Sequence, residues 1–292
     1  MSDPTPETFQ AKAVDLTKNV EEANVVEVRN VTKSYKNNGQ IETVIENMNL
    51  VIPNEQAGEF TAILGPSGSG KSTLMNMIGG TLAPTSGEVF AFGKKIEGDN
   101  PFAVTVQQAY TCLPWLTVQR NVEFGLEIRG MDKATRRQVA SDYIEKVGLG
   151  DRSSALPKEL SGGMQQRVAI ARCLALKPKI MLMDEPFGAL DAKIREDMQG
   201  LLLKLWDQEK NCVIFITHDI TEALLLADRI IVVSSRPAKI IEDMRVPFAR
   251  PRMGPRAPVA DLAMTPEFLR VSQSLLKMLK EQGSRGQVRV SL

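Results

Sequence analysis

The sequence predicts an α/β fold built around a parallel sheet, and three observations support that prediction. A glycine-rich segment, residues 65–72, joins the apolar run Phe60–Leu64 to a helix-like run. A second run, Ile180–Met183, is apolar at every position, as expected of a strand buried on both faces of a parallel sheet. Helix-like segments and apolar runs, among them Cys212–Ile216, then alternate along the chain, which is typical of α/β proteins.

The composition is that of an ordinary globular protein. The chain has 292 residues, 43% of them hydrophobic, which is ample for a packed core. Basic and acidic residues number 36 and 35 and are well mixed, so the charge gives no indication of a nucleic-acid partner. The cysteines are widely spaced, each among apolar neighbours, and we expect reduced core thiols at Cys112, Cys173 and Cys212.

No segment predicts a membrane span or an export signal. No apolar run approaches the ~18 residues that are needed to cross a bilayer. The first residues, Met1–Glu7, lack the basic and apolar regions of a signal peptide. We therefore expect a soluble, cytoplasmic protein.

Changes of pattern divide the chain into three parts. Residues 1–23 are polar and lack sustained periodicity, so we interpret them as a flexible N-terminal extension. Residues 24–246 carry the patterns of one domain, with a helical insertion at about 109–176. Residues 247–292 comprise a linker rich in proline and arginine, followed by an amphipathic helix that Thr265 caps.

Local patterns predict the individual elements. Alternation predicts a hairpin from Val25 to Ile52, whose first strand ends at Tyr35. A shorter hairpin is predicted over residues 88–96, and a strand over 103–106. The remaining helices are predicted over 118–128, 132–147, 160–176, 192–209 and 221–227, and the remaining strands over 180–183, 212–216 and 230–233. The apolar residues of the last helix are Phe268, Leu269, Leu275, Leu276 and Leu279.

The glycine-rich segment fits the pattern G-x-x-x-x-G-K-[ST] in full. Between a strand and a helix, its backbone N–H groups can surround a phosphate, which the positive end of the helix also attracts. Lys71 can then reach the β- and γ-phosphates, and the Ser72 hydroxyl is placed to bind Mg²⁺. The alternative is a surface loop with a chance lysine. The expected ATP-binding residues here are Gly65, Pro66, Ser67, Gly68, Ser69, Gly70, Lys71, Ser72 and Thr73.

Two carboxylates follow the buried run at 180–183. Asp184 is suited to hold Mg²⁺, and Glu185 is suited to polarise a water molecule that attacks the γ-phosphate. Without a phosphate-binding loop, a surface acidic pair at a strand end would be the better interpretation. With the loop, the pair indicates a nucleotide hydrolase, although kinases, GTPases, helicases and transport ATPases all carry such a loop.

Three further segments make the family recognisable. Residues 160–167 (LSGGMQQR), 180–186 (IMLMDEP) and 188–191 (GALD) resemble the signature, Walker B and D-loop motifs of the ATP-binding cassette (ABC) ATPases, in the same order and spacing. The resemblance covers about residues 25–246. It implies a P-loop NTPase (RecA-like) core, an N-terminal antiparallel β subdomain and an inserted α-helical subdomain, with ATP and Mg²⁺ as cofactors.

The resemblance also implies residue roles. Tyr35 matches the aromatic residue that stacks on adenine, although composition alone favours a half-buried strand-end residue. His218, the one histidine of the chain, matches the switch histidine that contacts the γ-phosphate. Gln108 matches the glutamine that touches Mg²⁺ or water. The family usually has Val-Phe-Gln there, whereas this chain has Val-Gln-Gln at 106–108, and counting back from Leu113 selects Gln108.

In such proteins the signature contacts ATP that is held by an opposing subunit. The matching residues are Ser161, Gly162, Gly163 and Gln165, and Asp191 matches the D-loop aspartate. The resemblance therefore implies that the chain pairs head to tail with a second ABC ATPase subunit, either an identical chain or a relative.

The run at residues 112–118, CLPWLTV, is similar to the ATPase subunits of nitrate, sulfonate and taurine importers. This similarity implies an integral-membrane permease as partner, a periplasmic or surface solute-binding protein as an indirect one, and a location at the inner face of the cell membrane. Trp115 would lie at the groove that receives the permease, or would be a core aromatic residue of the helical subdomain.

Three alternatives stay open. The chain could serve a lipid transporter or another ABC transporter. It could be a soluble ABC ATPase acting on ribosomes or DNA, although those usually carry tandem cassettes or a long coiled coil. It could also be a nucleotide-binding regulator that does not hydrolyse ATP, which Glu185 and His218 argue against.

Overall fold

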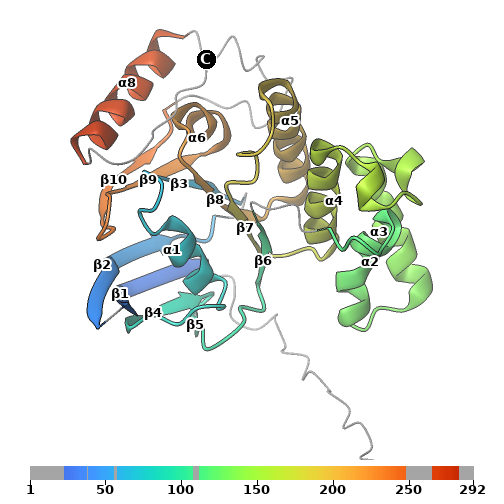
Figure 1. Ribbon diagram of the computed structural model, residues 1–292, viewed down its shortest axis with the longest axis horizontal. Coiled ribbons are helices and arrows are strands. Elements are labelled where there is room, and N and C mark those ends of the chain that lie inside the picture. Colours follow the sequence, from blue (N-terminus) through green and yellow to red (C-terminus); the bar gives the residue numbers. More distant parts are fainter. Residues whose placement is uncertain (1–22, 38, 56–57, 108–111, 248–264, 283–292) are drawn as a thin grey trace, which may run out of the picture.

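The computed structural model describes residues 23–282, apart from 38, 56–57, 108–111 and 248–264. Two sheets organise the described chain (Figure 1). The first has the strand order β2-β1-β4-β5 and is antiparallel. Its strands are β1 (Val26–Asn37), β2 (Gln40–Ile52), β4 (Ser86–Ala91) and β5 (Lys94–Lys95). Both predicted hairpins are therefore confirmed, although β1 continues past Tyr35 to Asn37.

The second sheet is the core of the molecule, with the order β10-β9-β3-β8-β7-β6. Its strands are β3 (Phe60–Leu64), β6 (Ala103–Val106), β7 (Ile180–Asp184), β8 (Cys212–Thr217), β9 (Arg229–Val233) and β10 (Ile240–Arg245). All neighbours are parallel except β10, which pairs antiparallel with β9. The sequence patterns did not predict β10.

Register brings the chemistry-bearing strand ends to one edge of this sheet. Leu64 of β3 is paired with Thr217 of β8, and Asp184 of β7 is paired with Ile216 of β8. The segments that follow β3, β7 and β8 therefore leave the sheet side by side. The carboxyl edge of a parallel sheet is where ligands bind in such folds.

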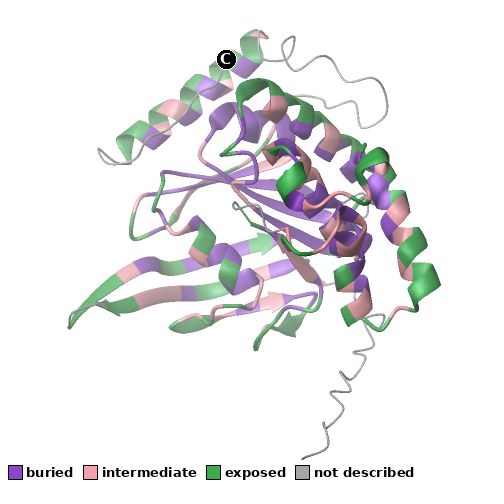
Figure 2. Ribbon diagram, turned by 45° about the vertical axis from the view of Figure 1, so that its right-hand side comes forward, coloured by how far each residue is buried: buried purple, intermediate pink, exposed green. Residues whose placement is uncertain are grey.

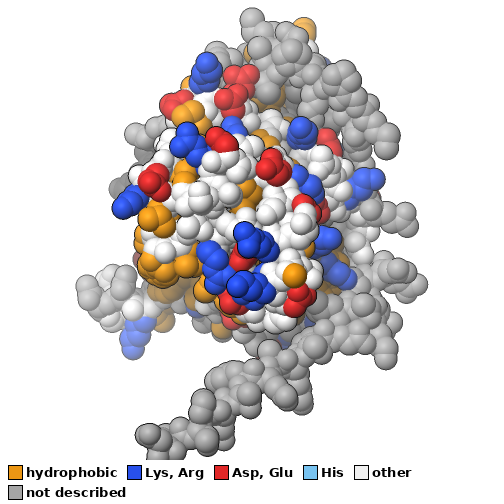
Figure 3. Space-filling model, turned by 90° about the vertical axis from the view of Figure 1, so that its right-hand side faces the viewer, with side chains coloured by type: hydrophobic (Ala, Val, Ile, Leu, Met, Phe, Trp, Pro, Cys, Tyr) orange, Lys and Arg blue, Asp and Glu red, His pale blue; other side chains and the backbone are white. Residues whose placement is uncertain are grey.

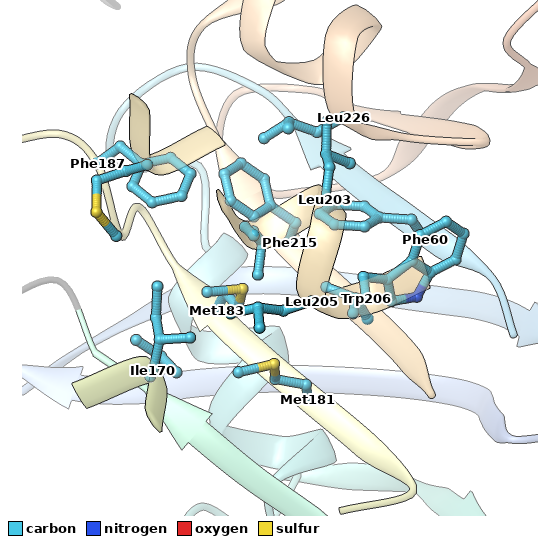
Figure 4. Close-up of a cluster of buried hydrophobic side chains, with 14 of the residues drawn as sticks. Phe60, Ile170, Met181, Met183, Phe187, Leu203, Leu205, Trp206, Phe215 and Leu226 are labelled. Carbon is cyan, nitrogen blue, oxygen red and sulfur yellow. The ribbon is translucent and has the colours of Figure 1, made fainter. Parts of the chain in front are cut away.

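Alternating side chains of the parallel strands fill two cores, one on each face. Phe60, Met183 and Phe215 pack with residues of the helices, including Trp206, whose ring lies 5.8 Å from that of Phe60 in an edge-on arrangement (Figure 4). Ile63 and Ile216 face the other way, toward α1 and the antiparallel sheet. The central strands are buried throughout (Figure 2). Burial on both faces explains why these strands are apolar at nearly every position.

Helices cover both faces and form a separate group at one side (Figure 1). Their bounds are α1 (Lys71–Ile78), α2 (Val118–Ile128), α3 (Lys133–Lys146), α4 (Gly162–Ala175), α5 (Ala192–Glu209), α6 (Ile220–Leu226) and α8 (Pro266–Glu281). Short 3₁₀ turns occupy Gly150–Arg152 and Pro157–Glu159. The helices α2, α3 and α4 contact one another, which confirms the inserted helical subdomain.

Side-chain caps explain where several helices begin. Asp132 accepts hydrogen bonds from the backbone N–H groups of Ala134 and Thr135, and Thr265 accepts one from Phe268. The cap at Thr265 was predicted. The last helix buries Phe268, Leu275 and Leu279, but Leu269 is 40% exposed, so its assignment to the apolar face was wrong.

Two further predictions need correction. Cys173 and Cys212 are buried free thiols, whereas Cys112 is only half-buried. Trp115 is 72% exposed, so the alternative of a core aromatic residue is wrong.

Among the residues that the structure describes, no helix combines the length and apolar character that a membrane span requires. The N-terminal extension and most of the linker after residue 246 lie outside the described residues.

Candidate active site

The phosphate-binding loop lies between β3 and α1. Lys71 is buried, and its Nζ donates hydrogen bonds to the carbonyl oxygens of Gly65 and Pro66, both at 2.9 Å. Burial lowers the pKa of this lysine, and the charges of Glu185 and Asp184 oppose that effect. Gly70 caps the helix with φ of 101°, a conformation that favours glycine. The loop thus holds its cation in place, within electrostatic reach of two carboxylates.

Asp184 and Ser72 adjoin each other at the start of α1. The Ser72 hydroxyl lies close enough to Asp184 to interact with its carboxylate. Burial raises the pKa of Asp184, while this interaction and the charge of Lys71 lower it. A hydroxyl and a carboxylate are oxygen ligands of the kind that Mg²⁺ takes when it also binds phosphates. The two residues therefore fit a magnesium ion.

Glu185 and His218 form the centre of the site. Oε2 of Glu185 lies 3.0 Å from Nδ1 of His218, and both side chains are largely shielded from solvent. The adjoining histidine ring lowers the pKa of Glu185, against the effect of burial. Glu185 has φ of 42°, and its N–H donates to the carbonyl of Ile216 at 3.0 Å. A positive φ in a residue other than glycine is strained and is often found at functional sites.

A side chain that the sequence did not single out ties the loop to the antiparallel sheet. Nε of Arg236 donates to the carbonyl of Gly68 at 2.6 Å, and Nη1 forms an ion pair with Glu42. Glu42 is paired with Tyr35 across the hairpin, so both side chains lie on one face of that sheet. Tyr35 itself is 39% exposed. Its ring is therefore accessible near the phosphate-binding loop.

The signature segment, residues 161–165, lies at the start of α4. Ser161 caps this helix by accepting a hydrogen bond from the N–H of Met164 at 3.3 Å. Gln165 donates to the carbonyl of Pro157 at 2.9 Å. A Cβ on Gly163 would lie 2.6 Å from Cγ2 of Ile194, so α4 and α5 approach closely at this position. Asp191 caps α5 by accepting from the N–H of Ile194 at 3.0 Å.

The candidate residues thus fall into two groups. The first, called here the phosphate site, consists of Lys71, Ser72, Asp184, Glu185 and His218, which interact with one another. The second is the signature segment. Within the described part of the chain, no hydrogen bond or ion pair joins the two groups. Gln108, the remaining predicted catalytic and magnesium-binding residue, lies outside the described residues.

A lysine-bearing glycine loop between a strand and a helix, with a carboxylate at the end of another strand of the same parallel sheet, defines the class of P-loop nucleotide-binding proteins. The comparisons narrow this class. A family model described as ABC transporter matches residues 45–188. The nitrate import ATP-binding protein of Synechocystis sp. is 42% identical over 236 residues, covering 81% of this chain and 88% of that protein.

Two further similarities agree with this result. The taurine import ATP-binding protein of Roseobacter denitrificans is 44% identical over 224 residues, covering 77% of this chain and 83% of that protein. A solved dimeric ATP-binding cassette in a post-hydrolysis state, bound to ADP and Pi, is 36% identical with a TM-score of 0.66, covering 77% of this chain and 100% of that one. The chain belongs to the family of ABC transporter ATP-binding proteins.

Proposed function

We propose that this chain is the ATP-hydrolysing subunit of an ABC importer for a small anion of the nitrate, sulfonate or taurine kind. The observation that carries the ATPase function is the convergence of Lys71, Asp184, Glu185 and His218 from three different strand ends. A cation, an oxygen ligand for a metal, a carboxylate base and an imidazole at one place are the groups that phosphoryl transfer to water requires.

Each residue of the phosphate site has a distinct part in the proposal. Lys71 leaves its two carbonyl acceptors for phosphate oxygens, with the backbone of residues 65–73 around them. Ser72, Asp184 and Gln108 hold Mg²⁺, which supplies positive charge beside the phosphates when it is bound. Glu185 accepts a proton from the attacking water, and its lowered pKa keeps it ionised for that purpose. His218 both contacts the γ-phosphate and orients Glu185.

In this proposal, the signature segment of one chain completes the phosphate site of a second copy of the chain. Ser161 is exposed, and it caps the start of a helix, an end that attracts anions. The described chain contains no link from this segment to its own phosphate site. Support for a pair of cassettes comes from the dimeric structure to which the chain is similar.

The helical subdomain is the proposed docking surface for a membrane permease, which places the chain at the inner face of the membrane. Trp115, Phe124 and Ile128 are large apolar side chains that stay exposed on or beside α2. The face that carries the helical subdomain mixes such apolar groups with charges of both signs (Figure 3). The proposed anion class is supported by relatives named for nitrate and taurine import. A solute-binding protein would deliver the anion to the permease.

Uptake by cells that lack this gene tests the importer function. We expect the deletion strain to lose uptake of labelled nitrate, taurine or an alkanesulfonate, and expect the wild-type chain to restore it. The K71A variant should fail to restore uptake, because the loop then lacks the ammonium group that binds phosphate. Unchanged uptake of all three anions in the deletion strain would contradict the proposed substrate class, while ATP hydrolysis by the purified chain tests the ATPase function separately.

A further inference from the structure

A buried carboxylate that the proposed chemistry does not use lies directly behind the site. Glu222 of α6 is 6% exposed. Its Oε2 accepts a hydrogen bond from the Thr217 hydroxyl at 2.5 Å, and its Oε1 accepts one from Nε2 of Gln199 at 3.1 Å. Burying a carboxylate is expensive unless it gains such partners, and an apolar residue would fill the same space without that cost.

The hydrogen bonds of Glu222 hold the backbone on both sides of His218. The Thr217 hydroxyl, which donates to Glu222, also accepts from the N–H of Asp219 at 3.0 Å. Asp219 in turn accepts from the N–H of Glu222 at 3.1 Å. His218 thus lies between two residues that one ring of hydrogen bonds fixes. The histidine ring, Thr217, Glu222 and Glu185 line a small common cavity.

The same carboxylate links this loop to α5. Gln199 lies in α5 eight residues, about two helical turns, after the capping residue Asp191. Arg195, one turn before Gln199, lines the cavity with His218 and donates to the carbonyl of Leu190 at 3.0 Å. A shift of the start of α5 can therefore reach the histidine loop through Gln199 and Glu222.

We propose that Glu222 is a positioning residue: by holding Thr217, Asp219 and Gln199 together, it sets the orientation of His218 beside Glu185 and couples that orientation to α5. The inference rests on the proposed role of His218 in hydrolysis. It goes beyond that role because it assigns the orientation of the histidine to a buried side chain that has no part in the proposed chemistry.

Replacement of Thr217 by valine is the test, because it removes the hydroxyl while keeping the shape. The chain offers a matched control: the buried Thr61 hydroxyl donates to the buried Glu59 at 2.7 Å, at the opposite end of the strands. T217V and T61V should lose similar thermal stability. Only T217V should lower kcat, by about 10- to 100-fold, as misplacement of a catalytic group by roughly 1 Å does. ATP affinity should stay unchanged in both variants.

A spectroscopic readout separates positioning from mere packing. His218 is the single histidine of the 292-residue chain, so its ring protons give unambiguous NMR signals. We expect these signals to shift in T217V and in E222Q, and to keep their wild-type positions in T61V. Q199L should shift them in the same direction as E222Q, by less.

Two outcomes would overturn the inference: equal kcat in T217V and T61V, or His218 signals at their wild-type positions in both T217V and E222Q. If T217V does not fold, E222Q keeps the side-chain volume and decides the question by the same two measurements. The wild-type rate of ATP hydrolysis is measured in parallel, so failure of the proposed ATPase function would be seen independently of the variants.

Discussion

The phosphate site and the signature segment differ in how far the chain itself completes them. In the phosphate site, side chains that follow three neighbouring strands contact one another, and the lysine is 5% exposed. In the signature segment, Ser161 is exposed and its hydroxyl accepts a hydrogen bond from the N–H of Met164 in its own helical turn. The backbone groups of both segments are suited to bind phosphate. In the phosphate site, two carboxylates and a histidine lie beside the lysine.

This difference indicates that each ATP is bound by two chains, of which one supplies the catalytic groups and the other supplies the signature segment. A segment that presents a helix start to solvent can contribute phosphate binding. A segment with a base, a metal ligand and a buried lysine can perform the chemistry once the γ-phosphate is fixed. The close approach of Gly163 to Ile194 places the signature segment beside α5, which Asp191 caps. Movement of one partner against the other would therefore act on both motifs.

The largest expected effect comes from removing the base. E185Q should lower ATP turnover by about 10²- to 10⁴-fold, because general-base catalysis contributes on that order. ATP binding should persist, and light scattering should show an ATP-dependent dimer. Replacement of the exposed Glu97 by glutamine is the control and should leave turnover unchanged. Normal turnover in E185Q would exclude Glu185 as the base.

Mixed dimers test directly whether the phosphate site of one chain works with the signature segment of another. K71A damages the phosphate site, and S161E adds a negative charge to the signature segment, so each variant alone should be inactive. In a mixture, the intact phosphate site of S161E can meet the intact signature segment of K71A. We expect the mixture to regain part of the wild-type rate of phosphate release. A mixture as inactive as its components would contradict the head-to-tail arrangement.

The adenine end of the site is tested by Tyr35. Y35A should weaken ATP affinity by about 1 to 3 kcal/mol, which is the contribution of a base stacked on an aromatic ring. Y35F keeps the ring and should bind ATP as the wild type does. ATP affinity is measured by isothermal titration calorimetry, with both variants made in the E185Q background so that ATP is not hydrolysed during the measurement. Equal affinity in Y35A and Y35F would mean that Tyr35 has no stacking role.

The smallest expected effect is a change of stability with pH. The pKa of Glu185 is lower in the folded chain than its ordinary value of 4.5, so the unfolded chain binds this proton at higher pH than the folded chain does. The contribution to stability is therefore present above the ordinary value and is lost as the pH falls through the folded pKa. The difference in melting temperature between wild type and E185Q should shrink over that range. A difference that grows toward acid pH would contradict the sign of the shift.

Local signals in the sequence predicted most of the fold. The helices at 118–128 and 192–209 have the predicted bounds, because apolar periodicity and capping residues are encoded within a few positions. The strand β10 was missed because it is an outer strand whose residues include Glu242 and Asp243, so it lacks an apolar run. Its pairing with β9 is a tertiary property that a local pattern does not contain.

The same contrast between local sequence signals and tertiary contacts applies to the residues of the candidate site. The motifs around Lys71 and Glu185 were recognisable because their residue types and spacing are specific. Arg236 was not, since its contact with Gly68 spans 168 positions and lies in a loop without a motif. The Thr217–Glu222 hydrogen bond spans five positions, yet the amino-acid sequence does not show that both side chains are buried. Only the packed structure decides which polar residues meet.

The two hydrogen bonds of Lys71 to its own loop have a thermodynamic consequence for ligand selection. The ammonium group of Lys71 has two carbonyl acceptors within its own loop, those of Gly65 and Pro66. Binding becomes an exchange of acceptors, and its free energy is the difference between two satisfied states. An isolated inorganic phosphate offers little beyond that exchange. A nucleoside triphosphate adds contacts along the whole loop and at Tyr35, so the loop discriminates by the length of its ligand.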